Sequence, residues 1–310
     1  MIDPDIQRLL DTIFNAAPVT PAPNVAELRA AAEEAPRRLG GAHEMLASVR
    51  DVDIPGPAAP IPLRIYEPGG DGPFPLLLFA HGGGWVTGSL DSHDKLCRIL
   101  AKRLPAVVVA VGYRCAPEHV YPAALDDVEA AWRWVRTRAA SVGADGERFG
   151  VAGDSSGGNL AAALTLRLRE EGKPQPDLQL LLYPALDSTC SRASYRNFSA
   201  GFNLSAAQMT WYWDAYRAGS AHDAPELSPL AARSLAGLAP AVIAVVENDV
   251  LRDDAIDYAR RLAGDGAAVT VVHCDGMIHG FLRWTGEVPA AIRWIDKIAD
   301  ASRVTLKSGR

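Results

Sequence analysis

The chain has 310 residues, of which 48% are hydrophobic and 22% are charged, and its formal net charge is −6 at pH 7. This composition supports a large core, and the length suits one large α/β domain or two small ones. A mildly acidic chain without a run of Lys or Arg gives no reason to expect binding to nucleic acid or to an anionic membrane. No apolar run reaches the roughly 18 residues that span a bilayer.

The N-terminus, MIDPDIQRLLDTIFNAA, starts with acidic residues and continues with an amphipathic pattern. It lacks the basic start and apolar centre of a signal peptide, so we expect a cytoplasmic protein. The four cysteines lie far apart and form no CxxC pair: Cys97, Cys115, Cys190 and Cys274. We therefore expect free thiols that take part in neither disulfides nor a metal site.

From about residue 44 onward, apolar runs alternate with helical patterns, which predicts βαβ units. Eight runs are interpreted as strands: 45–54, 61–68, 75–81, 106–113, 148–154, 178–184, 241–249 and 268–274. The middle runs are almost continuously apolar, as expected of parallel strands buried on both faces. The first two runs flank the Pro-rich turn PGPAAPIP, which favours an antiparallel hairpin at the sheet edge.

Helical patterns are predicted over residues 94–104, 124–139, 159–172 and 253–266. Two of them end at glycine, Gly172 and Gly264 or Gly266, as a helix stop should. Two segments do not fit the alternation of strands and helices. Residues 1 to about 43 form two amphipathic helical patterns around PVTPAPN, and residues 187–225 contain the aromatic-rich pattern NLSAAQMTWYWDAYRAG. Both segments could cover the sheet as a lid, or they could be ordinary packing helices.

The stretch VAGDSSGGNL, residues 151–160, contains the pattern Gly-x-Ser-x-Gly with Ser155 at its centre. It follows a predicted strand and precedes a predicted helix, which is the context of a nucleophile elbow. Gly153 and Gly157 leave room for the sharp bend, because a Cβ there would strike neighbouring backbone. Ser155 takes the strained apex, whereas Ser156 begins the helix, where its backbone N–H can stabilise an oxyanion.

A serine hydroxyl needs a general base, and in this fold the order is serine, acid, histidine. The histidines that follow Ser155 are His222, His273 and His279. His222 falls in the aromatic-rich segment, and His273 lies in the last strand, where we expect it to face a neighbouring layer. His279 lies in CDGMIHGFL, which we interpret as a loop directly after the last strand, so His279 is the predicted base.

The acid that orients the imidazole should also stand at the carboxyl end of a strand. Asp249 ends the run AVIAVVEND and is the first choice, although a helix cap is an alternative role for it. Asp275 ranks second, because it shares a loop with His279 and would need a tight turn to reach the ring. Asp154 is not chosen, because an elbow points that side chain away from Ser155.

HGGGW, residues 81–85, follows an early central strand. A glycine run in a loop is often only a turn, but here it stands where hydrolases with a nucleophile elbow place the second oxyanion donor. The joint occurrence of HGGG, GxSxG, Asp and His, each after its own strand, is more specific than any one of them.

The chain resembles the hormone-sensitive-lipase-like bacterial esterases, a branch of the α/β-hydrolases. The matching segments are HGGGW, YRCAPEHVYPAALDD, GDSSGGNL, LLYPALD, LSAAQMTWYWDAY, ENDVLRDDA and GMIHGF. The resemblance implies a mostly parallel eight-stranded sheet with helices on both faces and a helical cap. Two positions depart from the family pattern: Ser156 stands where Ala is usual, and Val250 stands where Pro is usual. Neither departure affects the predicted triad.

The resemblance implies a catalytic triad of Ser155, Asp249 and His279. It implies an oxyanion hole formed by the N–H groups of Gly83, Gly84 and Ser156. It also implies a substrate pocket lined by residues of the cap and its surroundings, for which we predict Trp85, Tyr183, Leu204 and Trp213. Glu118 and His119 are expected to belong to a supporting network.

We therefore expect a single domain over residues 1–310, with a core of about 44–186 and 226–303 and a cap of about 1–43 and 187–225. The implied function is a carboxylesterase that cleaves short- to medium-chain acyl esters through an acyl-enzyme, without a metal or another cofactor. The expected partner is a small-molecule ester, with no nucleic acid, no membrane insertion and a possible homodimer. The alternatives are an amide or formamide hydrolase with the same triad, and a ligand-binding receptor on the same fold.

Overall fold

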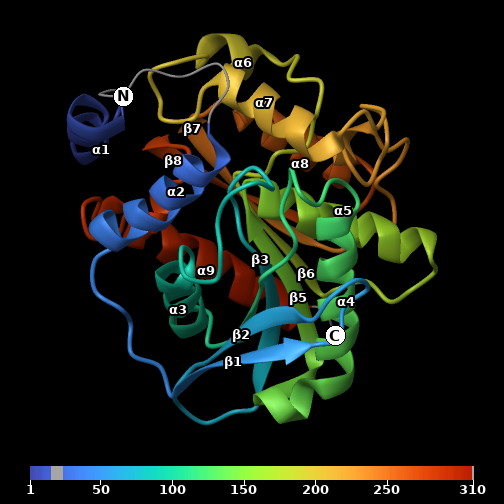
Figure 1. Ribbon diagram of the computed structural model, residues 1–310. Coiled ribbons are helices and arrows are strands. Elements are labelled where there is room, and N and C mark those ends of the chain that lie inside the picture. The colour runs from blue at the N-terminus through green and yellow to red at the C-terminus, as the bar shows by residue number, and fades with distance from the viewer. Residues whose placement is uncertain (15–23, 309–310) are drawn as a thin grey trace.

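The computed structural model describes residues 1–14 and 24–308, and an eight-stranded sheet forms its centre (Figure 1). The strands are β1 (Ser48–Ile54), β2 (Ile61–Glu67), β3 (Phe74–Ala80), β4 (Val107–Val111), β5 (Ala144–Asp154), β6 (Leu178–Leu182), β7 (Ala241–Asn248) and β8 (Val269–Ile278). They lie across the sheet in the order β1-β2-β4-β3-β5-β6-β7-β8. Each of the eight predicted runs therefore contains a strand.

The pairing confirms a mostly parallel sheet with an antiparallel hairpin at one edge. Strand β1 pairs antiparallel with β2, and β2 pairs antiparallel with β4. All pairs from β4 to β8 are parallel. Every residue of β4 (Val-Val-Val-Ala-Val) is buried, because helices cover both faces of the sheet.

The last strand is longer than the predicted run 268–274, so the prediction that a loop precedes His279 was wrong. Strand β8 continues to Ile278, because its pairing with β7 shifts after Val246 and resumes between Asn248 and Ile278. The stretch after residue 274 is therefore an irregular part of the strand rather than a loop. His279 follows directly, at the carboxyl end of β8.

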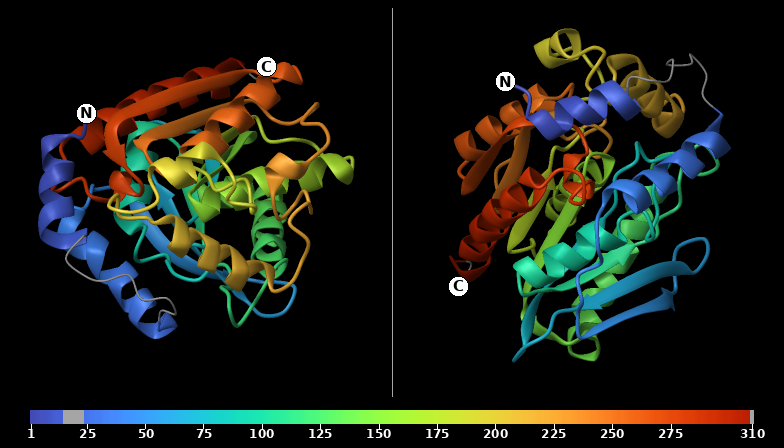
Figure 2. Two further views of the ribbon diagram at one scale, coloured as in Figure 1. Left: turned by 90° about the horizontal axis from the view of Figure 1, so that it is seen from above. Right: turned by 90° about the vertical axis from the view of Figure 1, so that its left-hand side faces the viewer.

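Two layers of helices enclose the sheet (Figure 2). The first layer packs on one face with α4 (Ala123–Arg138), α5 (Ser156–Glu170) and α8 (Arg252–Gly264). The second packs on the opposite face with α3 (Asp94–Arg103) and α9 (Ala290–Ser308). Helix α9 was not among the helices predicted from the sequence. Gly172 and Gly266 both take positive φ just beyond α5 and α8, as expected of helix stops.

The two segments outside the alternation lie at the end of the sheet to which the parallel strands point (Figures 1 and 2). The first contributes α1 (Pro4–Leu9), a wider turn over Leu10–Phe14, and α2 (Val25–Leu39). The second contributes α6 (Ala193–Asn197) and α7 (Ala206–Arg217). Most of the predicted Pro-rich link between the first two helices falls at 15–23, outside the described residues. We use the name cap for these two segments, about 1–43 and 187–225.

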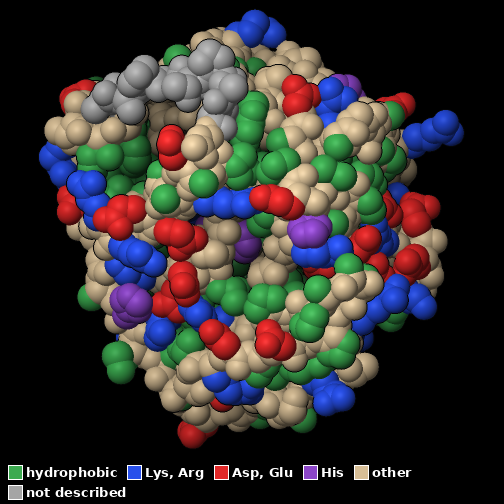
Figure 3. All heavy atoms as spheres, viewed as in Figure 1, with side chains coloured by type: hydrophobic (Ala, Val, Ile, Leu, Met, Phe, Trp, Pro, Cys, Tyr) green, Lys and Arg blue, Asp and Glu red, His purple; other side chains and the backbone are tan. Residues whose placement is uncertain are grey.

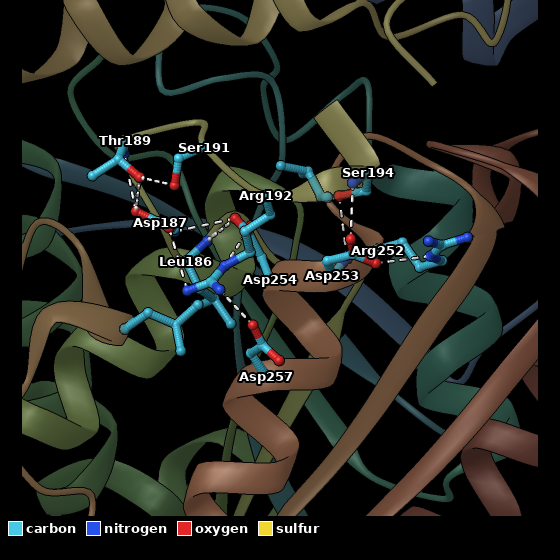
Figure 4. A network of polar contacts seen from close by, with 12 residues as sticks. Leu186, Asp187, Thr189, Ser191, Arg192, Ser194, Arg252, Asp253, Asp254 and Asp257 are labelled. Carbon is cyan, nitrogen blue, oxygen red and sulfur yellow. Dashed lines mark hydrogen bonds and ion pairs between the residues drawn. The ribbon is translucent and has the colours of Figure 1, made fainter. Parts of the chain in front are cut away.

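A charged network fastens the second cap segment to α8 (Figure 4). The guanidinium of Arg192 lies 3.3 Å from Asp187 and 3.5 Å from Asp254, and it also pairs with Asp257. Asp254 is fully buried and accepts the N–H groups of Leu186 and Asp187, each at 3.1 Å. Burial raises the pKa of Asp254 well above its ordinary value, against the pull of these N–H groups and of Arg192.

The surface carries charges of both signs, and acidic and basic side chains are interspersed over the face shown in Figure 3. None of the helices in the described part of the chain combines the length and the apolar character that a membrane span requires. The four cysteines are free thiols, and Cys97 and Cys274 are buried.

Asp254→Asn should change how stability depends on pH. The pKa of Asp254 is higher in the folded state than in the unfolded state, where it is about 3.9. The stability that its protonation contributes is fully present below that unfolded pKa, and it is lost as the pH rises through the folded pKa. The unfolding free energy of the variant minus that of the wild type should therefore increase between about pH 4 and pH 7. Urea unfolding at four pH values measures this difference, and a flat or falling difference would contradict the raised pKa.

Candidate active site

Ser155 occupies the turn between the end of β5 at Asp154 and the start of α5 at Ser156. Its backbone angles are φ 55° and ψ −118°, a strained conformation for a residue with a side chain. The Ser155 N–H donates to the carbonyl of Leu182 on β6 at 2.9 Å, which helps to hold the turn. The local geometry is therefore that of the predicted elbow, with Ser155 at the apex.

The two glycines of the motif are needed because backbone segments touch here. A Cβ on Gly157 would lie 2.0 Å from the carbonyl oxygen of Ala80, the last residue of β3. A Cβ on Gly153 would lie 2.2 Å from the backbone of Gly157. Both distances are far below van der Waals contact, so any side chain at these positions would push β3, β5 and α5 apart.

The structure brings Ser155, His279 and Asp249 together from the ends of three strands. His279 Nε2 lies 2.9 Å from Ser155 Oγ, and His279 Nδ1 lies 2.7 Å from Asp249 Oδ2. A carboxylate can only accept, so the proton of the neutral imidazole belongs on Nδ1. That tautomer leaves the Nε2 lone pair facing the serine hydroxyl. All three residues are at most 8% exposed, which keeps bulk water away from the contacts.

Neighbouring groups hold the acid and the imidazole in place. Asp249 uses Oδ1 to accept the N–H of Leu251 at 2.9 Å, which leaves Oδ2 for His279. The ring of Tyr183 stands edge-on to the His279 ring, with centroids 4.9 Å apart. Asn203 of the cap donates to the His279 carbonyl at 3.3 Å.

The other candidates lie elsewhere. His222 contacts the Ser188 hydroxyl through Nδ1 at 3.0 Å, inside the second cap segment. His273 was expected to face a neighbouring layer, but it is exposed, because β8 is the edge strand and its outer side chains are not covered. Asp275 is also exposed, and it is Asp249 that contacts the ring of His279.

The glycine loop after β3 is shaped by a buried carboxylate. Gly83 and Gly84 have φ of 126° and 61°, and the Gly83 carbonyl accepts the N–H of Thr87 at 2.9 Å. Asp154 Oδ1 accepts the N–H of Gly82 at 2.7 Å and lies 3.1 Å from His93 Nε2. The Asp154 side chain therefore turns away from Ser155, as predicted, and anchors the loop.

The electrostatics of this anchor favour a charged carboxylate. Burial opposes ionisation of Asp154, but His93, Arg283 and the Gly82 N–H together hold its pKa below the ordinary value. Burial and the neighbouring His93 lower the pKa of His81 to about 3, so His81 stays neutral. The loop is thus held by one fixed negative charge across the neutral pH range.

A cavity of about 410 Å³ opens beside Ser155 and His279. Its floor includes Asp154, Gly83 and Gly84. Its walls come from both cap segments, from the turn after the base and from Thr87 beside the glycine loop. The cap and turn residues are Ile13, Phe14, Leu28, Ala31, Ala32, Glu34, Ala35, Arg38, Leu39, Asn203, Leu204, Gln208, Met209, Tyr212, Arg283 and Trp284. Within residues 1–14 and 24–308, no group of three or more His, Cys, Asp or Glu side chains is arranged to hold a metal ion.

The comparisons with known proteins place the chain in a family. Residues 77–283 match the family description "alpha/beta hydrolase fold". The chain belongs to the α/β-hydrolase family. It is similar to the carboxylic ester hydrolase LipN of Mycobacterium tuberculosis, with 42% identity over 294 residues that cover 91% of this chain and 77% of LipN. Esterase LipI of the same species is 38% identical over 310 residues, which cover 98% of this chain and 95% of LipI.

This chain also resembles a solved esterase structure over almost its whole length. The ester hydrolase from the metagenome of Lake Arreo, complexed with a derivative of bipyridine phosphonate, superimposes with a TM-score of 0.94 at 36% identity. The match covers 99% of this chain and 100% of that one. Together these findings confirm the resemblance to the hormone-sensitive-lipase-like esterases and the fold that it implied.

The predicted pocket residues of this α/β-hydrolase need correction. Leu204 lines the cavity, but Trp85, Tyr183 and Trp213 do not line its described part. Trp85 is fully buried and its ring stacks parallel on that of Tyr216, with centroids 4.5 Å apart. The centroid of the Trp213 ring lies 4.2 Å from that of Trp85. These rings fasten α7 to the HGGGW segment. Tyr183 packs behind His279 instead.

Sequence reasoning missed most of the wall of this α/β-hydrolase's cavity. Helix α2 presents Ala31, Ala32 and Ala35 to the cavity, and their spacing on an amphipathic helix was the available signal. Tyr212 packs against the glycine loop. A Cβ added to Gly84 would lie only 2.2 Å from the Tyr212 ring. Arg283 was overlooked because it follows the base by only four residues in a short turn.

Helix α2 is tied to the core by an ion pair. Arg29 binds both carboxylate oxygens of Glu118, at 2.9 and 2.6 Å, and donates to the carbonyls of Val86 and Ala116. Hydrogen bonding to Arg29 lowers the pKa of Glu118 to about 2. Glu118 therefore belongs to a supporting network, and its partner is a residue of the cap.

Gly157→Ala should destabilise this α/β-hydrolase by about 1–3 kcal/mol or more, because the new Cβ would overlap the Ala80 carbonyl. Gly264→Ala is the matched control, since a Cβ there meets nothing within 4 Å. An alanine in a helix is favoured over glycine by about 0.5–1 kcal/mol, so the control should be neutral or stabilising. Urea unfolding measures both. Equal stability of the two variants would contradict the close backbone contact at the elbow.

Proposed function

We propose that this chain is a carboxylic ester hydrolase that cleaves short- to medium-chain acyl esters through an acyl-enzyme on Ser155. The observation that carries the proposal is the continuous contact from Asp249 through His279 to Ser155 Oγ, at 2.7 and 2.9 Å, beside a cavity. The names of the relatives, carboxylic ester hydrolase and esterase, support the same reaction.

The geometry supports the following steps. Ser155 Oγ attacks the ester carbonyl carbon while its proton passes to His279 Nε2, and Asp249 stabilises the imidazolium that forms. The tetrahedral intermediate collapses, the C–O bond to the alcohol breaks, and Nε2 returns the proton to the leaving oxygen. Water then attacks the acyl-enzyme with the same base, which releases the acid and restores Ser155.

We place the oxyanion on the backbone N–H groups of Gly83, Gly84 and Ser156. Gly83 and Gly84 line the cavity next to Ser155, and Ser156 begins α5, where the first N–H groups of a helix have no partner within the helix. Such donors act where negative charge develops, and removing one typically costs about 100- to 1,000-fold in rate. The loop anchored by Asp154 keeps the first two donors in position.

The possible homodimer and the cytoplasmic location expected from the sequence remain predictions.

Ser155→Ala should reduce kcat on p-nitrophenyl butyrate to background, a loss on the order of a millionfold, because the triad acts as a unit. Ser156→Ala should change kcat by less than about tenfold, since its backbone N–H remains. Steady-state hydrolysis by the wild type and both variants measures this. A dead Ser156→Ala with an active Ser155→Ala would overturn the assignment, and a wild type inert on all esters would overturn the proposed function.

The acyl preference should follow the cavity. From the volume of about 410 Å³ and the family resemblance we expect acyl chains of about two to eight carbons. We expect kcat/KM to peak within this range in a series of p-nitrophenyl esters from acetate to palmitate. Faster cleavage of long-chain triglyceride emulsions than of soluble butyrate esters would contradict it.

A further inference from the structure

Arg283 lines the cavity and forms no ion pair within the described residues. Arg283 ends a short turn, Phe281–Arg283, just after His279, and its side chain lines the same cavity as Ser155. Its Nε is buried and has no hydrogen-bond partner. Within residues 1–14 and 24–308, no carboxylate forms an ion pair with its guanidinium. Other arginines, such as Arg29 and Arg192, do form ion pairs.

Neither of the two carboxylates that also line the cavity forms an ion pair with Arg283. Asp154 is already engaged by the Gly82 N–H and by His93, at 2.7 and 3.1 Å. Glu34 is an exposed residue of α2. Arg283 therefore lines the cavity without an ion pair, while the carboxylate of Asp154 binds the glycine loop.

The field of Arg283 reaches both sides of the cavity. Burial raises the pKa of Tyr212, on the cap side, while the hydrogen bond to Thr87 and the charge of Arg283 lower it. On the opposite side, the same charge helps to keep Asp154 ionised. Arg283 thus sits within electrostatic range of the nucleophile turn and of the cap at once.

Arg283 is partly buried, and its buried Nε has lost hydration that no hydrogen bond from the protein replaces. A carboxylate matches the planar donor fork of arginine and can accept two parallel N–H bonds from it. We propose that the cavity binds esters that carry a free carboxylate, and that Arg283 binds this carboxylate and so selects monoesters of dicarboxylic acids or esters of hydroxy acids. The inference rests on the proposed ester hydrolysis and names its substrate class.

The test compares charged esters with neutral esters of similar length. Monomethyl glutarate and methyl hexanoate place the charge on the acyl side, and 4-acetoxybutyrate and pentyl acetate place it on the alcohol side. Acid release at constant pH gives kcat/KM for each. For the wild type we expect a higher kcat/KM for the charged ester in at least one pair. That pair shows whether Arg283 binds a carboxylate on the acyl part or on the alcohol part of the ester.

Arg283→Met should lower kcat/KM for that charged ester about 10- to 100-fold more than for its neutral partner, as the loss of a charge-assisted hydrogen bond implies. Arg283→Lys should keep part of the preference, because the charge remains and the fork is lost. Arg38→Met is the matched control, since Arg38 lines the same cavity from an exposed position. An equal loss for both members of each pair in Arg283→Met, or an equal shift in Arg38→Met, would overturn the assignment.

A binding measurement separates this inference from the reaction. Calorimetry on Ser155→Ala should show tighter binding of monomethyl glutarate or 4-acetoxybutyrate than of its neutral partner, and Ser155→Ala/Arg283→Met should lose that difference. If the difference is present while the wild type hydrolyses no ester, the proposed function fails and the carboxylate site stands. If the wild type hydrolyses neutral esters and neither charged ester binds more tightly, the carboxylate site fails alone.

Discussion

The contact between the nucleophile turn and the end of β3 is the constraint on which the site depends. A Cβ at Gly157 would lie only 2.0 Å from the Ala80 carbonyl, so the helix after Ser155 starts directly against the residue that precedes the glycine loop. Because backbone meets backbone, the spacing between the main chain of the nucleophile turn and that of the glycine loop does not depend on side-chain rotamers. Ser155, directly before this helix, has the strained φ of 55°.

The parallel sheet performs the remaining assembly. Ser155 and His279 are 124 residues apart in the chain, yet their side chains meet, because β5 and β8 end at the same edge of the sheet. Asp249 arrives in the same way from β7. All three residues are at most 8% exposed, so the imidazole and the carboxylate interact in a poorly hydrated setting.

The sequence was sufficient for the sheet and for the meeting of Ser155, Asp249 and His279, because strand periodicity and chain order determine which ends come together. It was insufficient for the cavity wall. Trp85 and Trp213 carry the same apolar signal as a pocket residue, and the structure shows that they pack on each other instead. Which face of a cap helix points inward depends on contacts made by the whole fold, so Ala31 and Tyr212 were not predicted. The extent of β8 was wrong for a similar reason, since its irregular end is set by pairing with β7.

The cap is built from two stretches that the sheet does not require for its own hydrogen bonding. The residues that meet a substrate beyond the reacting atoms come largely from these stretches, and α2 is attached to the core through Arg29. Most of the cavity wall is therefore separate in the chain from the triad, with Arg283 and Trp284 after the base as exceptions. Substitutions at the cavity-lining residues of α2 can change the shape and charge of the cavity without touching the triad, which gives this protein a scaffold whose substrate range can diverge while its reaction stays the same.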